Sequence, residues 1–118
     1  MIDKIKKSLY IYKVCPFLKW KKALVVGKFY GYGIDLIDGY IHFSLGHQVE
    51  KTLELHFNKQ KGLCLLEVST ENLDIKWEKA RDNQLFPHLY DELNVNFVTQ
   101  VIILSLSKNN VHILPILK

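Results

Sequence analysis

The sequence VTQVIILSL at residues 98–106 is the longest run of β-branched and apolar residues in the chain, and it predicts a strand. A shorter apolar run, LCLLEV at residues 63–68, follows Gly62 and is too brief for a helix, so it predicts a buried strand. Beyond 98–106, residues 111–114 are expected to return antiparallel until Pro115 ends the pairing. These runs suggest a β-rich second half.

Two helices are expected before these strands. In residues 16–26, Phe17, Trp20 and Leu24 recur at the three- and four-residue spacing of one helical face, and residues 45–58 show the same period. Two helices followed by several strands, without regular βαβ alternation, predict an α+β fold with mostly antiparallel pairing. The remaining segments are expected as strands at 9–14, 40–43 and 74–78, an ordered loop at 30–39, and an irregular segment at 79–97.

Composition predicts one small globular domain spanning residues 1–118. Apolar residues make up 48% of the 118 and charged residues 24%, a balance that allows a buried core. No apolar run approaches the roughly 18 residues of a membrane span, so a cytoplasmic protein without membrane contact is expected. Cys15 and Cys64 show no paired or zinc-type spacing, which predicts reduced thiols, a buried Cys64 and no metal site.

Charge is unevenly distributed along the chain. The first 28 residues hold eight lysines against Asp3 alone, whereas the remainder holds eight basic and eleven acidic residues. A basic segment of this kind is compatible with RNA or another anionic surface. Lys19, Lys21 and Lys22 fit equally well as the solvated side of the first helix.

The segment DGYIHFS at residues 38–44 is the first candidate for chemistry. Strand alternation places Tyr40, His42 and Ser44 together on a polar face. If Ser44 caps the helix at 45–58, the first helical amides would suit a phosphate. The alternatives are a Ser44 that only caps the helix and a His42 that is a hydrogen-bonded structural residue.

A second candidate surrounds Arg81, the only arginine in a chain with fifteen lysines. Guanidinium offers a planar fork of donors to phosphate or carboxylate, which lysine cannot reproduce. The alternative is a structural pair with Asp82 or Glu78. An extended backbone would place His88 and Tyr90 on one side, either as ligand-binding groups or as partners of loop backbone groups.

Five motifs follow one another along the chain in a characteristic order and spacing: DGYIHFS at 38–44, Gln48, LLEV at 65–68, WE at 77–78 and LFPHLY at 85–90. Together they resemble a family known as domain of unknown function 952, with a match from about residue 9 to 106. Trp20 and Tyr30 also occupy positions typical of the family. The resemblance implies a fold like the ADP-ribosyltransferase catalytic domain, a split antiparallel β structure with two main helices that grips NAD or a phosphorylated RNA junction.

The chain departs from the family pattern at two positions. Lys13 stands where the family usually has the first-strand histidine that, in related enzymes, helps to hold the ribose of NAD. Lysine supplies a cation but not the neutral donor and acceptor of an imidazole. Asp91 stands where a glycine is common, which affects only a turn.

Together these observations predict a cleft for a nucleotide-type ligand and, if chemistry occurs, transfer of an ADP-ribosyl or phosphoryl group. His42 and His88 are the predicted acid–base groups, and Glu78 or Asp82 would stabilise a cationic sugar. NAD is the cofactor that the fold resemblance implies, and the alternative is a non-catalytic module that binds a ligand or a protein. The predicted ligand-binding residues are Lys13, Tyr40, Ser44, Arg81, Asp82, Phe86 and Tyr90.

Overall fold

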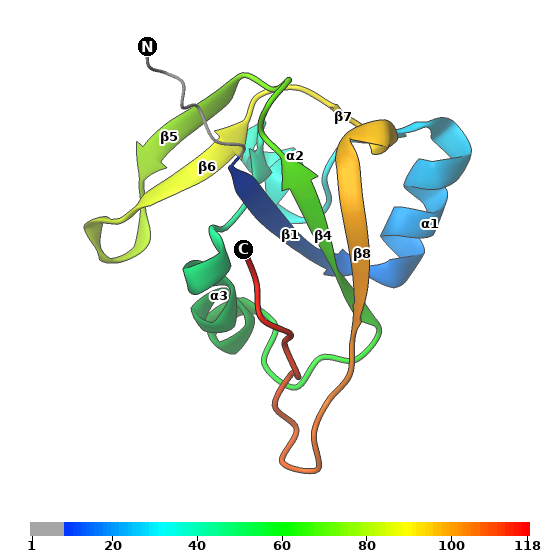
Figure 1. Ribbon diagram of the computed structural model, residues 1–118, viewed down its shortest axis with the longest axis vertical. Helices are drawn as coiled ribbons and strands as arrows, with labels where there is room; N and C mark the ends of the chain where they lie inside the picture. Colours follow the sequence, from blue (N-terminus) through cyan, green and yellow to red (C-terminus); the bar gives the residue numbers. More distant parts are fainter. Residues whose placement is uncertain (1–8) are drawn as a thin grey trace.

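The computed structural model describes residues 9–118 and shows antiparallel sheets with a few short helices around them (Figure 1). The predicted α+β class is therefore confirmed. The strands are β1 (Tyr10–Pro16), β2 (Lys28–Phe29), β3 (Ile41–His42), β4 (Leu63–Ser69), β5 (Ile75–Lys79), β6 (Leu85–Leu89), β7 (Leu93–Asn94) and β8 (Val98–Leu104). The helices are α1 (Phe17–Val26), α2 (Ile34–Asp38) and α3 (Val49–His56), with 3₁₀ turns at Gly46–Gln48, Arg81–Asn83 and Val95–Phe97.

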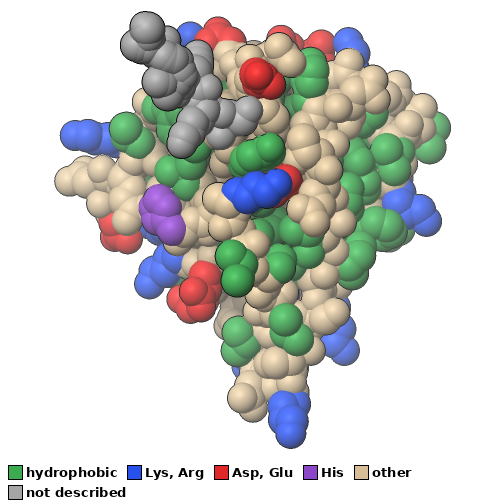
Figure 2. All heavy atoms as spheres, viewed as in Figure 1, with side chains coloured by type: hydrophobic (Ala, Val, Ile, Leu, Met, Phe, Trp, Pro, Cys, Tyr) green, Lys and Arg blue, Asp and Glu red, His purple; other side chains and the backbone are tan. Residues whose placement is uncertain are grey.

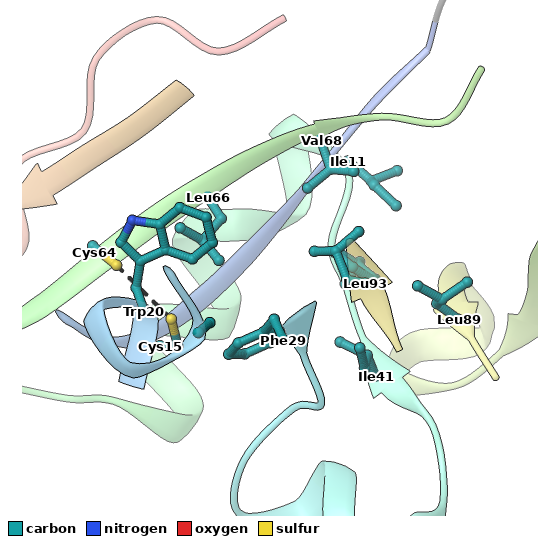
Figure 3. Packing of buried hydrophobic residues seen from close by; sticks show 12 residues of the cluster. Ile11, Cys15, Trp20, Phe29, Ile41, Cys64, Leu66, Val68, Leu89 and Leu93 are labelled. Carbon is teal, nitrogen blue, oxygen red and sulfur yellow. Dashed lines mark hydrogen bonds between the residues drawn. The ribbon is translucent and has the colours of Figure 1, made fainter. Parts of the chain in front are cut away.

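The first sheet has the order β1-β4-β8, and its middle strand is the centre of the molecule. Leu63, Leu65 and Leu66 of β4 are completely buried, as the apolar run in the sequence predicted. Trp20 of α1 packs on one face, beside Cys64 and Leu66 (Figure 3). The helical spacing predicted the position of α1, and Gly27, which is left-handed, predicted its end, but Trp20 and Ala23 form the buried face and Leu24 is exposed.

Two cysteines that lie far apart in the sequence are neighbours in this sheet. Cys15 of β1 is directly opposite Cys64 of β4, and their sulfur atoms are 3.8 Å apart as free, buried thiols (Figure 3). The hydrogen bond to Cys64, together with burial, raises the pKa of the Cys15 thiol. Spacing along the sequence gave no sign of this contact, because the pairing of two strands produces it.

A two-stranded sheet pairs β2 with β7, and a second three-stranded sheet has the order β3-β6-β5, in which Pro87 of the middle strand separates it from the first sheet. Phe43 donates its N–H to the carbonyl of Pro87, but proline has no N–H to return, so the β3–β6 ladder stops at His42. The chain then pairs with β1, where Tyr12 and Ser44 exchange two hydrogen bonds of 2.8 Å. The two sheets diverge from this link.

Two segments that were predicted to be irregular contain regular structure. The expected loop at 30–39 includes the five-residue helix α2, which is too short to show a helical period. Residues 79–97 include all of β6 and β7, because β6 is stabilised by its neighbours rather than by local preference. In both places tertiary contacts stabilise short helices and strands that the sequence pattern does not predict.

Smaller differences concern the ends of elements. The first helix begins at Phe17, and Pro16 instead ends β1. The predicted return strand at 111–114 is reduced to one bridge between Leu106 and His112, after which the chain crosses over the first sheet. No helix within residues 9–118 is both long and apolar enough to span a membrane.

Candidate functional site

A cavity of about 440 Å³ opens where the two sheets diverge, and it collects most of the predicted site residues. Segments that are up to 76 positions apart in the sequence meet there, from Tyr12 of β1 to His88 of β6. Side chains from the 30–39 segment and α3 complete the wall. The predicted residues that line the cavity are Lys13, His42, Ser44, Arg81, Phe86 and His88, and the others are Tyr12, Val14, Tyr32, Ile34, Phe43, Thr52, His56, Phe57 and Ala80.

His42 is held by a carboxylate on each side of its ring. Nδ1 lies 2.7 Å from Asp35 Oδ1, and Nε2 lies 3.1 Å from Asp38 Oδ2. The backbone N–H of His42 also donates to Asp35 Oδ1 at 3.1 Å. Both ring nitrogens of His42 therefore have a carboxylate partner.

Asp35 is the centre of this side of the site, and the sequence interpretation missed it. Its side chain is fully buried, and its Oδ2 forms an ion pair with Lys13 Nζ at 2.7 Å. Its other oxygen, Oδ1, is the partner of His42. Tyr32 donates its backbone N–H to the same carboxylate. Gly31 is needed beside it, because a Cβ there would lie 2.6 Å from the Asp35 Cβ. The turn-forming glycines around Asp35 were the only sequence signal, and they predicted an ordered loop without pointing to the aspartate.

Burial and charge act in opposite directions on this ion pair. Burial lowers the pKa of Lys13, and the negative charge of Asp35 opposes that effect. Burial by itself raises the pKa of Asp35, but the hydrogen bond from His42 and the charge and hydrogen bond of Lys13 outweigh it and lower the pKa. Lys13 is thus a cation tied to a carboxylate at the edge of the cavity.

His88 is held on one side only. Its Nδ1 lies 2.6 Å from Glu78 Oε1, and Tyr90 donates its hydroxyl to the same oxygen at 2.7 Å. Among residues 9–118, no group is hydrogen-bonded to Nε2 of His88. The hydrogen bonds from His88 and Tyr90 lower the pKa of Glu78, and the bond to Glu78 raises the pKa of Tyr90 to about 12.

Tyr40 stacks among the other rings of this group. Its ring centroid lies 4.4 Å from that of His42, 4.3 Å from that of His88 and 4.7 Å from that of Tyr90. Tyr40 and Tyr90 do not line the cavity but border a neighbouring hollow of about 300 Å³. The predicted common face of the two strands is therefore present, with the tyrosines supporting the imidazoles from outside the cavity.

Arg81 is attached to α3 rather than to a carboxylate. It donates at 3.3 Å to Thr52 Oγ1 and at 3.4 Å to the carbonyl of Gln48, and its guanidinium lies 4.9 Å from the centre of the Phe86 ring. Within the described chain it forms no ion pair, so the alternative of a structural pair with Asp82 or Glu78 is wrong. Asp82 is exposed on the turn and does not line the cavity.

Ser44 is not the N-cap of the second helix. Its hydroxyl shares a hydrogen bond of 3.0 Å with Thr52 Oγ1, and the helix starts with a 3₁₀ turn whose first amide, that of Leu45, is bonded to Gln48 Oε1. Gly46 packs closely against the backbone of Lys118, so that a Cβ at position 46 would lie only 2.7 Å from the Lys118 carbonyl oxygen. The prediction that Ser44 caps this helix is therefore wrong, and the Leu45 amide of the predicted phosphate site is already occupied by Gln48.

The arrangement combines cations, an oriented imidazole and aromatic walls. Glu78 fixes one nitrogen of His88 and leaves the other able to accept or donate a proton, which is the usual requirement for acid–base work. Arg81 has donors beyond its two long bonds to α3. Glu78 itself is 43% exposed and does not line the cavity, so it acts through His88.

Comparisons with known proteins agree with the motifs in the sequence. A search of curated proteins gives no match. The crystal structure of protein CC0527 from Caulobacter crescentus is similar with a TM-score of 0.83 and 40% identity, over 88% of this chain and 93% of that chain. The solution NMR structure of CC0527 has a TM-score of 0.78 and 41% identity, over 86% and 90% of the two chains. The family model described as "Protein of unknown function (DUF952)" matches residues 14–101. This chain therefore belongs to the DUF952 family, as its motifs predicted.

Proposed function

We propose that the cavity binds a phosphorylated ligand of the nucleotide type and that His88 serves as the acid–base group for transfer of an ADP-ribosyl or phosphoryl group. One observation carries the proposal. Five nitrogen-bearing side chains from distant segments, those of Lys13, His42, His56, Arg81 and His88, line the same cavity. Clustered cations and an oriented histidine in a concave site are typical of anionic ligands and their chemistry.

The shape and lining of the cavity support a ligand that has both a ring and a phosphate. Tyr32, Phe57 and Phe86 give aromatic surface on which a base or similar ring can stack. The guanidinium of Arg81 lies 4.9 Å from the centre of the Phe86 ring, and its planar fork suits two phosphate oxygens. The volume of about 440 Å³ is within the range of small-molecule sites.

The fold supports NAD as the probe to test first. Two small antiparallel sheets that diverge from the Tyr12–Ser44 link are compatible with the ADP-ribosyltransferase-like structure that the family resemblance implies. In such a transfer, His88 Nε2 takes the proton of an acceptor hydroxyl as its oxygen bonds to ribose C1′. The bond from C1′ to nicotinamide breaks in the same step, and nicotinamide leaves as a neutral molecule.

The substitution Arg81→Lys tests the role of the guanidinium. We expect the affinity for ADP-ribose, NAD or the best nucleotide phosphate in a thermal-shift screen to fall at least tenfold, because lysine cannot offer two parallel donors. The melting temperature without ligand should change little, since the two bonds of Arg81 to α3 are long. Titration calorimetry measures the affinity.

Lys79→Gln is the matched control, because it removes a cation from β5 outside the cavity. It should leave ligand affinity unchanged. Equal affinity in wild type and Arg81→Lys would remove Arg81 from the proposed site. Failure of every nucleotide in the screen to bind would overturn the proposal as a whole.

A non-catalytic binding module is the second candidate, and Lys13 is the observation that favours it. The residue stands where the family usually has a histidine, and its ion pair with Asp35 leaves it a fixed cation. Turnover assays on each ligand that binds separate the two candidates, because a module binds without releasing nicotinamide or transferring phosphate. Binding of RNA through the basic first quarter stays a prediction, and Lys4, Lys6 and Lys7 lie outside the described residues. Steep dependence of RNA affinity on salt would support it.

A further inference from the structure

The outer edge of β8 is an open strand edge, and after a bulge at Thr99 its residues lack the charges and prolines that usually block pairing. β8 is the last strand of the β1-β4-β8 sheet, and none of its seven residues is charged, proline or glycine. Native proteins normally protect such edges with charges, prolines, bulges or a covering element. Val101 is 36% exposed and Ile103 is 59% exposed on this strand.

The hydrogen-bond pattern shows which groups of β8 face outward. Thr70 donates to Leu9 and Phe17 donates to Gly62, so β4 uses its even-numbered residues for β1 and its odd-numbered residues for β8. The partners of those odd-numbered residues are Gln100, Ile102 and Leu104. The N–H and C=O groups of Val101 and Ile103 therefore point away from β4. Outside the ladder with β4, no backbone group within residues 9–118 bonds to either residue.

Both ends of this open edge are defined. Toward the N-terminus the register shifts at Thr99, which forms a bulge and bonds to Glu67 instead. Toward the C-terminus the carbonyl of Ser105 accepts the N–H of Ile113, and the pairing ends before Pro115, which has no N–H. The open window thus consists of Val101 and Ile103, with Ile102 at its midpoint.

We propose that β8 pairs antiparallel with β8 of a second copy of this chain, on a twofold axis at Ile102. Val101 of each copy would then lie opposite Ile103 of the other, with four backbone hydrogen bonds and a continuous six-stranded sheet. A twofold interface brings each residue close to its own symmetry mates, so an uncharged strand avoids repulsion between like charges. Only in this register do both residues of the open window, Val101 and Ile103, pair with the same window of the second copy.

Side chains next to the strand support the same partner. Figure 2 shows hydrophobic side chains on the α1 side of the face that carries β8, and Leu24 and Val25 of α1 are among the exposed apolar residues. The cavity lies at the opposite edge of the sheet, beside β1, and so stays open in both copies. Pairing of one strand buries less than the roughly 1,200 Å² of a stable dimer, so we expect reversible association that increases with concentration.

Sedimentation equilibrium of the full chain over a range of concentrations is the first test, and a monomer–dimer equilibrium is expected. Ile103→Lys should shift this equilibrium at least tenfold toward monomer, because a charge at an edge opposes pairing. Ile37→Lys is the matched control, since Ile37 is a more exposed isoleucine on α2, and it should dimerise like wild type. A wild-type chain that stays monomeric, or equal effects of the two substitutions, would overturn the proposal.

A crosslinking test checks the register independently. At a twofold axis on Ile102, the two copies of this residue form a non-hydrogen-bonded pair about 4.5 Å apart, which allows a disulfide. Ile102→Cys should therefore form a covalent dimer under mild oxidation with diamide, on a non-reducing gel. Gln100→Cys, on the same face two residues away, places its two copies roughly 13 Å apart and should stay monomeric on the gel. Equal crosslinking at both positions, or none at Ile102→Cys, would contradict this register. Wild type shows the background from the buried Cys15 and Cys64.

Discussion

His42 and His88 are direct partners on neighbouring strands, and their ring centroids are 5.3 Å apart, yet their surroundings differ. His42 has a carboxylate at each ring nitrogen, whereas His88 has one carboxylate and one nitrogen without a partner in residues 9–118. The first arrangement holds both ring nitrogens of His42. The second leaves an oriented nitrogen at a cavity. The comparison shows that the partners of a histidine, rather than its place on a strand, decide whether it is available for chemistry.

The largest expected effect is a loss of stability when Asp35, which contacts both Lys13 and His42, is replaced. Asp35→Asn removes the charge that faces Lys13 and His42 and leaves a buried lysine without a counter-charge. Loss of one partner of a buried ion pair typically costs about 3–5 kcal/mol. Urea unfolding of the variant should show a decrease of this order in the free energy of unfolding.

The double variant Lys13→Met, Asp35→Asn serves as the control for this prediction. It removes both charges, so it should be more stable than Asp35→Asn alone. If Asp35→Asn were as stable as wild type, the carboxylate would not be the centre of the site. If the double variant gained nothing, the ion pair with Lys13 would not be the cause of the loss.

Exchanging each histidine for glutamine sharpens the comparison. His42→Gln should cost about 1–3 kcal/mol of stability, because Asp35 and Asp38 lose charged donors. His88→Gln should cost less stability and should reduce ADP-ribose affinity or turnover at least tenfold, since His88 lines the cavity. Urea unfolding and ligand titration of both variants measure the two effects. The same ratio of stability loss to affinity loss in both variants would show that the two histidines are equivalent.

The smallest effect is the pH dependence of the Glu78 contact. The hydrogen bonds from His88 and Tyr90 lower the pKa of Glu78 in the folded state. A carboxyl group of this kind stabilises the fold above its unfolded pKa of about 4.3, and the contribution disappears as the pH falls through the folded value. The stability difference between wild type and Glu78→Gln should therefore be full at about pH 6 and should shrink toward about pH 3.

Unfolding curves at several pH values measure this difference, which stays small because Glu78 is 43% exposed and screened by solvent. Asp74→Asn is a suitable control, since Asp74 is more exposed and lies outside this contact. A difference that grew as the pH fell would contradict the direction of the pKa shift.

Each residue that sequence analysis predicted for the site was identified by a local pattern in the sequence. Strand alternation grouped Tyr40 and His42, and composition singled out Arg81. Asp35 had no such pattern, because its role depends on Lys13, a residue 22 positions earlier on another element. Ser44 was assigned to the helix that follows it, but its hydroxyl bonds to Thr52 within that helix instead.

The sequence by itself determined the family, the fold class, the buried strand at 63–68 and the position of α1, because motifs and hydrophobic periods are local properties of the chain. Only the tertiary structure decided which imidazole has a free nitrogen, which carboxylate faces Lys13 and which strand edge stays open. Those features arise from contacts between segments far apart in the sequence. The free energy of such contacts depends on burial and register, which appear only when the chain has folded.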